Sequence, residues 1–137
     1  MTYPVLSCTA IDAREPRALA DFYCALLGLH PRPDDEPPPP PAPDDDTDWI
    51  VLLDADGQRI LAVQEKKELR SSTWPSEEIP MQLHMDFRVP DAQQLEVQRE
   101  RAEQLGARLL LDRSEDTEEP LYVMADPEDH PFCLLVG

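Results

Sequence analysis

The chain is short of glycine, cysteine and basic residues. Only four of its 137 residues are glycine, and none lies in a phosphate-cradling loop, so nucleotide binding gains no support. Its three cysteines are an odd number and lack CxxC spacing, which favours reduced thiols over a disulfide framework. Lysine and arginine number 12 against 29 acidic residues, and no basic cluster offsets the net charge of −17. We therefore predict no nucleic-acid or membrane-surface partner.

Long apolar runs are also missing. No stretch approaches the roughly 18 apolar residues of a membrane-spanning helix, and "MTYPVLSCTA" has no basic segment followed by an apolar run. We expect neither a membrane span nor secretion, and predict a cytoplasmic protein. The length suits one compact domain, residues 1–137, with a core large enough to carry a pocket.

Acidic residues and prolines, by contrast, are abundant and concentrated. Much of the acidity lies in residues 33–46 and 112–120, which are typical of solvated loops that aid solubility. Residues 31–47 hold too many prolines to donate ladder hydrogen bonds, so we predict an extended, mobile loop where a strand is otherwise expected. The alternative is a polyproline segment that a recognition module binds.

The first half of the chain begins with a strand and a helix. Residues 5–12 read as the strand, and residues 15–29 repeat apolar side chains at three- and four-residue spacing, which predicts the helix. Pro16 suits the first turn of this helix and Gly28 suits the position just past its end.

The second half repeats this order. Residues 81–89 alternate strictly between apolar and polar side chains, which predicts a half-buried strand. A helix then begins after Asp91 and ends at Gly106. Short β-strand candidates follow both helices: residues 48–54 and 59–65 in the first half, and residues 107–112, 121–125 and 131–136 in the second. The repetition predicts one domain built from two similar halves.

Three blocks of the sequence carry a recognisable order and spacing. They are "AIDAREPRALADFYCALLGL", "TWPSEEIPMQLHMDFRVPDAQQLEVQRERAEQLGARLL" and "VMADPEDHPFCLL". Together they resemble the vicinal oxygen chelate superfamily, and within it the small glyoxalase-like, bleomycin-resistance-like single domains. The resemblance implies an α+β fold of two β-α-β-β-β modules that form a curled mixed sheet around a shared cleft. Module one then spans about residues 1–70, module two about residues 80–137, and a homodimer is expected.

The resemblance also implies where a metal is held. Metal-dependent members use four inward side chains, typically His, Glu or Gln, from the first and last strands of each module. The matching residues here are Cys8, Gln64, His84 and Cys133, with Cys133 in place of the usual Glu. Two thiols and an imidazole are able to bind zinc. A free cysteine also packs in protein cores as a small hydrophobic residue, which explains Cys8 and Cys133 without a metal. We therefore expect no bound cofactor and keep zinc as the alternative.

Several of these residues are predicted to line the cleft without a metal. His84 and Asp86 share one strand face, so the imidazole can donate to the carboxylate. Gln64 has no charge and suits ligand orientation. Trp74, in the segment between the modules, either covers the cleft mouth with its flat ring or packs within the linker.

The turn before Cys133 departs from the family pattern. Related proteins carry glycine where this chain has Asp129, and aspartate tolerates the left-handed conformation at modest cost. We therefore expect the turn to form, with His130 as a turn residue and not a catalyst.

The functional prediction depends on the carboxylate that is missing at Cys133, the last of the four ligand positions. Without it, glyoxalase-type isomerisation lacks its base, and ring-cleaving dioxygenase chemistry lacks its two-histidine, one-carboxylate iron site. We predict a small-molecule-binding protein with a degenerate metal site that sequesters a planar or cationic ligand. The alternatives are a metal-dependent lyase or isomerase with altered ligands, a nucleophilic pair of Cys8 or Cys133 with His84, and an interaction module built on the proline-rich loop. Whether the chain is an enzyme stays open.

Overall fold

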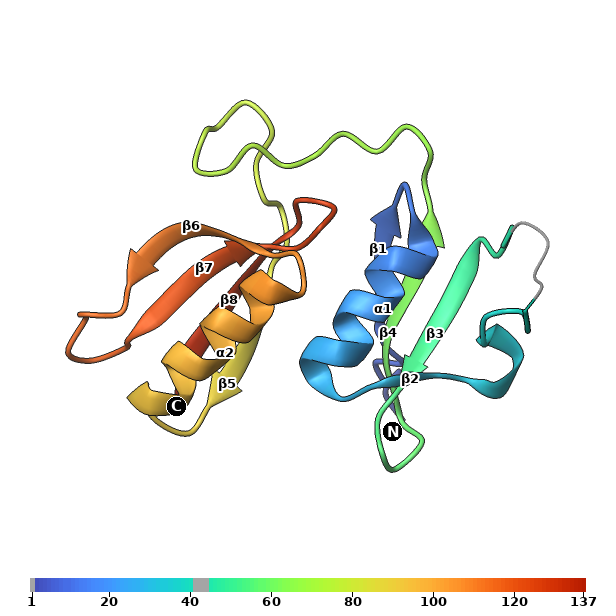
Figure 1. Ribbon diagram of the computed structural model, residues 1–137, viewed down its shortest axis with the longest axis horizontal. Helices are drawn as coiled ribbons and strands as arrows, with labels where there is room; N and C mark the ends of the chain where they lie inside the picture. The colour runs from blue at the N-terminus through green and yellow to red at the C-terminus, as the bar shows by residue number, and fades with distance from the viewer. Residues whose placement is uncertain (1, 41–44) are drawn as a thin grey trace. The chain divides into compact units, whose positions relative to one another are not determined.

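The computed structural model describes residues 2–40 and 45–137. The chain divides into two compact units, Met1–Leu69 and Arg70–Gly137, and each unit contains one β-α-β-β-β module (Figure 1). Module one consists of β1 (Thr9–Ala13), α1 (Pro16–Leu27), β2 (His30–Pro31), the short 3-10 helix η1 (Pro33–Asp35), β3 (Trp49–Leu53) and β4 (Arg59–Glu65). Module two consists of β5 (Met85–Val89), α2 (Ala92–Gln104), β6 (Arg108–Arg113), β7 (Leu121–Ala125) and β8 (Pro131–Val136). The predicted α+β duplication is confirmed.

Both modules have the same sheet topology. The strand orders are β1-β4-β3-β2 and β5-β8-β7-β6. In each module the first strand pairs in parallel with the last, and the remaining pairs are antiparallel. The amide of Lys66 donates to the carbonyl of Ala13, and that of Gly137 to the carbonyl of Val89, so the two parallel pairs end in the same way. These registers give a residue-by-residue correspondence between the modules.

The helices begin and end where the sequence signals indicated. Pro16 opens α1, and Gly28 closes it in the left-handed conformation at φ 70°. The Asp91 carboxylate accepts from the Gln94 amide at 2.8 Å and so caps α2. Gly106 follows α2 with φ 115°, a conformation that glycine adopts without a Cβ clash.

Two predicted strands begin later than expected. β1 starts at Thr9, so residues 2–8 lie outside it, and β5 starts at Met85 and not at Met81. Gln82 has a positive φ of 56°, which is incompatible with a continuous strand. The alternation of side chains in residues 81–89 therefore predicted too long a strand, because a regular pattern of side chains does not reveal a turn of the backbone.

The prediction that residues 31–47 contain no strand was wrong at its first residue. His30 and Pro31 form β2, which pairs with Leu53 and Leu52 of β3. Just beyond it, the carboxylate of the buried Asp35 accepts from the Val51 amide at 2.8 Å and from the Arg32 guanidinium at 2.6 Å, which ties this part of the segment to β3. Residues 41–44 lie outside the described residues.

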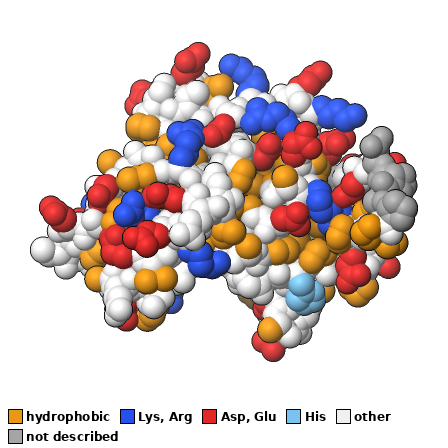
Figure 2. Space-filling model, in the orientation of Figure 1, with side chains coloured by type: hydrophobic (Ala, Val, Ile, Leu, Met, Phe, Trp, Pro, Cys, Tyr) orange, Lys and Arg blue, Asp and Glu red, His pale blue; other side chains and the backbone are white. Residues whose placement is uncertain are grey.

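Charged side chains of both signs are interspersed on the face of the molecule in Figure 2, with no single basic patch on it. None of the helices among residues 2–40 and 45–137 is long and apolar enough to cross a membrane. All three cysteines are free thiols, as predicted.

Candidate functional site

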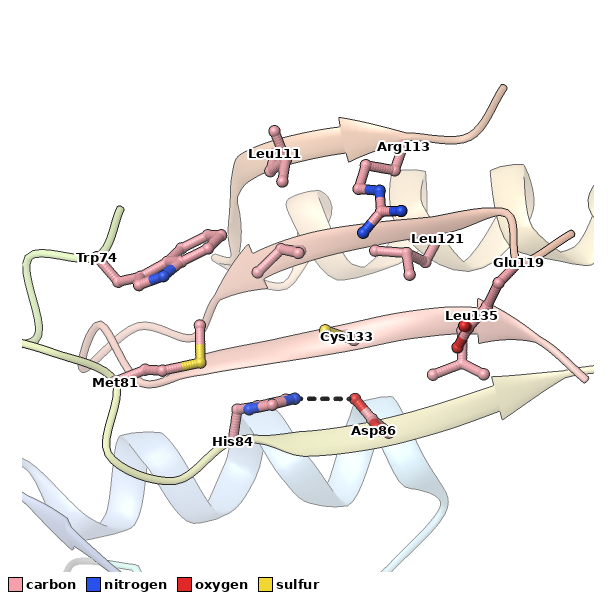
Figure 3. A pocket seen from close by; sticks show the side chains of 11 residues that line it. Trp74, Met81, His84, Asp86, Leu111, Arg113, Glu119, Leu121, Cys133 and Leu135 are labelled. Atoms are coloured by element: carbon pink, nitrogen blue, oxygen red, sulfur yellow. Dashed lines mark ion pairs between the residues drawn. The ribbon is translucent and has the colours of Figure 1, made fainter. Parts of the chain in front are cut away.

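Module two contains a cavity of about 270 Å³ over one face of its sheet (Figure 3). Tyr122 bonds to Glu96 of α2, so the alternation of β7 directs Leu121 and Val123 away from the helix and into the cavity. Eleven side chains line it: Trp74, Met81, His84, Asp86, Leu111, Arg113, Glu119, Leu121, Val123, Cys133 and Leu135. The floor comes from the two central strands, β7 and β8, and is apolar. The polar groups lie along the sides, on β5, on β6 and in the loop before β7.

Three of these side chains form a compact cluster of metal-binding atom types. Asp86 of β5 is the register partner of Cys133 in β8, and His84 lies two residues before Asp86. The His84 Nε2 atom is 3.3 Å from Asp86 Oδ1, and one ligand atom from each of the three residues lies within 4.8 Å of the others. Cys133 is only 7% exposed, whereas the side chains of His84 and Asp86 are 40% and 57% exposed. The cluster thus has a buried sulfur and a solvent-accessible imidazole and carboxylate.

The surroundings of Cys133 keep its thiol protonated. Burial raises the pKa of Cys133 to about 12, and the negative charges of Asp86 and Glu119 act in the same direction. A thiol with this pKa is a weak nucleophile at neutral pH, because the thiolate is the reactive form. The arrangement therefore disfavours the nucleophilic pair of Cys133 with His84.

Trp74 closes one end of the cavity. Its ring packs against the small buried cluster of Leu121, Val123 and Cys133. Its backbone amide donates to the Ser72 hydroxyl oxygen at 3.3 Å, within a segment that has no regular secondary structure. The indole thus offers a flat apolar wall beside the polar side formed by β5 (Figure 3).

The two remaining ligand candidates belong to module one. Cys8 is half-buried and immediately precedes β1, and Gln64 in β4 donates to the Asp12 carboxylate at 2.6 Å. Since His84 immediately precedes β5, Cys8 corresponds to His84 in the strand registers. The same registers match Cys133 with Ala62, and Gln64 with Leu135. A common site for all four predicted residues stays a prediction.

The turn that leads into β8 is held by a buried carboxylate. Asp126 Oδ1 accepts the backbone amides of Glu128 at 2.8 Å and His130 at 3.0 Å, and its Oδ2 lies 2.8 Å from His130 Nδ1. Asp129 has the left-handed conformation at φ 69°, and the turn forms as predicted. His130 takes part in the turn and is not among the residues that line the cavity. The turn fixes where β8, and with it Cys133, enters the sheet.

Sequence reasoning missed several residues of the cavity. Arg113 and Glu119 lie in a segment that was predicted to be solvated loop, and Leu121 and Leu135 were recognised only as strand residues. The usable signal was the alternation within residues 121–125 and 131–136, because Cys133 fixes the face on which Leu135 must lie. Nothing in the sequence pairs Arg113 with that face, since β6 and β7 change register between Leu109 and Leu111.

Comparison with known proteins agrees with this architecture. Residues 8–135 match the family described as a glyoxalase-like domain. The solved structure of the genomically encoded fosfomycin resistance protein FosX from Listeria monocytogenes is 16% identical, with a TM-score of 0.69 over 99% of this chain and 95% of that chain. A glyoxalase/bleomycin resistance protein/dioxygenase family enzyme from Burkholderia phytofirmans PsJN is 16% identical, with a TM-score of 0.67 over 95% of this chain and 96% of that chain. A possible glyoxalase from Bacillus cereus is 13% identical, with a TM-score of 0.63 over 96% of this chain and 97% of that chain.

These likenesses to solved structures show the fold, a duplicated β-α-β-β-β architecture. No curated protein matches the sequence. Because the family match spans nearly the whole chain, this protein belongs to the glyoxalase-like domain family.

Proposed function

We propose that this protein binds a small planar or cationic molecule in the cavity of module two and sequesters it without a metal. The observation that carries the proposal is the lining of that cavity: an apolar floor, one flat aromatic wall at Trp74, and ionisable groups along the sides. Ligand pockets combine a mostly apolar surface with a few polar groups that orient the ligand. The volume of about 270 Å³ suits a molecule of one or two rings.

Charge supports the preference for a cation. Two carboxylates, Asp86 and Glu119, line the cavity with one guanidinium, Arg113, and the whole chain has a net charge of −17. A negative protein raises the rate at which a cation arrives, and salt weakens that attraction. The indole of Trp74 favours a flat cation over its face.

A direct binding measurement tests this proposal. The chain has two tryptophans, so Trp49→Phe leaves Trp74 as the only indole fluorophore. In this background we expect benzamidine, a planar cation, to change the fluorescence saturably, and the neutral isostere benzamide to bind several-fold more weakly. Recovery of unchanged benzamidine would accord with sequestration. A fluorescence response that is linear in benzamidine, or identical for benzamide, contradicts the proposal.

The second candidate is a metal-dependent lyase or isomerase with altered ligands, and the cluster of His84, Asp86 and Cys133 favours it. Its nitrogen, oxygen and sulfur atoms lie within 4.8 Å of one another and fit the donor set that zinc accepts. These three residues would hold the metal, and Asp86 would supply the carboxylate that is missing at position 133. A metal bound there would act as a Lewis acid on substrate oxygens.

Metal titration separates the two candidates. The metal-free candidate predicts that protein purified without a tag or chelator contains no stoichiometric zinc, and that Co²⁺ gives no thiolate-to-cobalt absorption. Stoichiometric zinc that is lost in His84→Ala and in Asp86→Asn, but kept in His30→Ala, would establish the second candidate instead. His30 is the matched control because it lies in module one, in β2.

Two further expectations belong with this proposal. We infer that the protein is a homodimer, as the resemblance to the glyoxalase-like family implies, and that it is cytoplasmic, as its sequence favours. Light scattering coupled to size-exclusion chromatography tests the dimer: a mass of about 15.6 kDa at micromolar concentration contradicts it.

A further inference from the structure

The cavity of module two carries charge of both signs on opposite sides of an apolar floor. We propose that the ligand of this cavity is a planar zwitterion, an inference that rests on the proposed binding site. Its cationic group would lie beside Asp86 and Glu119, and its anionic group beside Arg113. One aromatic ring between the two charged groups would lie over the floor formed by β7 and β8. The inference therefore names the class of molecule that the site takes.

The negative side of the cavity consists of two carboxylates that come from different segments. Asp86 is on β5, and Glu119 is in the loop before β7. Both lie close enough to Cys133 to act on its thiol, and in Figure 3 Glu119 lies at the end of the cavity away from Trp74, with Asp86 between it and His84. A cationic group there meets two negative charges, and the carboxylate of Asp86 lies 3.3 Å from the His84 imidazole.

The positive side is the guanidinium of Arg113 at the end of β6. One of its terminal nitrogens bonds to Asp116 at 3.1 Å, in a pair whose side chains are 53% and 30% exposed. A guanidinium has five N–H donors, so this bond leaves donors with which to bind an anionic group. In Figure 3 the Arg113 side chain extends over β7 towards the cavity. A carboxylate is the natural partner, because it matches the fork of the guanidinium.

Strand order sets the spacing of the two charges. β5 and β6 are the outer strands of the order β5-β8-β7-β6, so three strand spacings, about 14 Å, separate their backbones. The side chains and their ion-pair contacts take up part of this span, and a single ring bridges the remainder. A simple cation leaves Arg113 without a ligand partner, and a simple anion faces Asp86 and Glu119. The zwitterion satisfies both sides.

Three matched probes test the inference: benzamidine, benzoate and 4-amidinobenzoate, which carries both charges on one ring. With Trp74 fluorescence as readout, we expect 4-amidinobenzoate to bind about threefold to fivefold more tightly than benzamidine, because exposed ion pairs are modest in strength. We expect benzoate to bind weakest. The advantage of the zwitterion should shrink as salt is raised from 20 to 500 mM, because partly exposed pairs are screened.

Variants assign the effect to named residues. In Arg113→Gln, 4-amidinobenzoate should bind less than twofold more tightly than benzamidine. Arg113→Lys should keep most of the difference in affinity between the two probes. Arg108→Gln is the matched control, since Arg108 is also on β6 but pairs with Asp129 and does not line the cavity. Asp86→Asn should lower the affinities for benzamidine and 4-amidinobenzoate by the same factor. The affinity for benzoate should stay unchanged or rise.

The outcomes separate this inference from the proposed function. If benzamidine binds as tightly as 4-amidinobenzoate in the unmodified chain, the inference of a zwitterionic ligand is wrong, whereas the proposed binding of a cation is supported. If benzoate binds as tightly as 4-amidinobenzoate, the role of the carboxylates is wrong. If the advantage of the zwitterion survives in Arg113→Gln, the assignment of Arg113 is wrong. If none of the probes binds, both the inference and the proposed function fall.

Discussion

Single residues in module two show how the local environment sets chemistry. Burial and two acidic neighbours keep the thiol of Cys133 neutral. The carboxylate beside it is that of Asp86, its register partner on β5. The cavity therefore presents a carboxylate at its side and an uncharged sulfur on its floor.

Alkylation measures this environment. A pKa of about 12 in place of 9.0 leaves roughly a thousandth of the thiolate at pH 8, so we expect iodoacetamide to modify Cys8 long before Cys133. Asp86→Asn should speed the modification of Cys133 several-fold, because it removes one of the charges that raise this pKa. Peptide mass spectrometry over a time course gives both rates, and equal rates at Cys8 and Cys133 contradict the expectation.

The same pKa has a consequence for stability. The thiol is protonated in both the folded and the unfolded chain below the unfolded pKa, so its burial carries no pH dependence there. Because the folded pKa is higher, the free energy of unfolding should fall as the pH rises from about 9 towards 12. Cys133→Ala should flatten this fall in chemical denaturation curves.

Asp126 is the residue on which the β7–β8 turn depends. Its carboxylate is fully buried and accepts from two backbone amides and the His130 ring. Asp126→Asn loses the charge-assisted bond to His130, and we expect a cost of about 2 kcal/mol in the free energy of unfolding. Asp21→Asn, on the exposed face of α1, is the control and should change it by less than about 0.5 kcal/mol. Urea titration distinguishes the two.

At the scale of elements, apolar periodicity predicted the first helix, and residues such as Pro16, Gly28 and Asp91 marked where the helices begin and end. The Asp91 cap of α2 is the clearest case, because its side chain accepts the Gln94 amide. Asp91→Ala should cost about 1 kcal/mol in the free energy of unfolding. The control Gln93→Ala, at an exposed position in the first turn of the same helix, should be neutral or slightly stabilising. Equal effects of the two substitutions would show that the cap does not matter.

Much of the fold was predictable from the sequence, and the reason differs between elements. β4, β7 and β8 were predicted at their observed bounds because turn residues flank short apolar runs. β2 was missed because two residues, one of them proline, carry no periodic signal. β1 and β5 were both predicted to begin too early; for β5 the side-chain alternation continued through Gln82, whose positive φ ends the strand geometry.

The candidate site was predictable only in part. His84, Asp86, Trp74 and Cys133 were candidates from the sequence, and all four line the cavity of module two. Arg113 and Glu119 were not, because their place depends on how four strands align and on a register shift inside the β6–β7 pair. Local sequence does not encode that alignment in a readable form.

At the scale of the whole molecule, excess negative charge is the dominant property. A net charge of −17 on 137 residues repels itself in the compact state, and salt screens this repulsion. We expect the midpoint of thermal unfolding to rise by several degrees between 10 and 200 mM NaCl. Glucose at matched osmolarity is the control and should have a much smaller effect. A midpoint that falls with salt would show that favourable ion pairs outweigh the repulsion.

The parallel pairing of β5 with β8 has a consequence for synthesis. β8 lies between β5 and β7 in the sheet, although it is the last of the four strands in the chain. β6 and β7 are adjacent in the chain and can form their hairpin by themselves, whereas β5 has no strand to bond to until β8 joins the sheet. Completion of the sheet, and of the cavity over it, therefore depends on the last strand of the module to be synthesised.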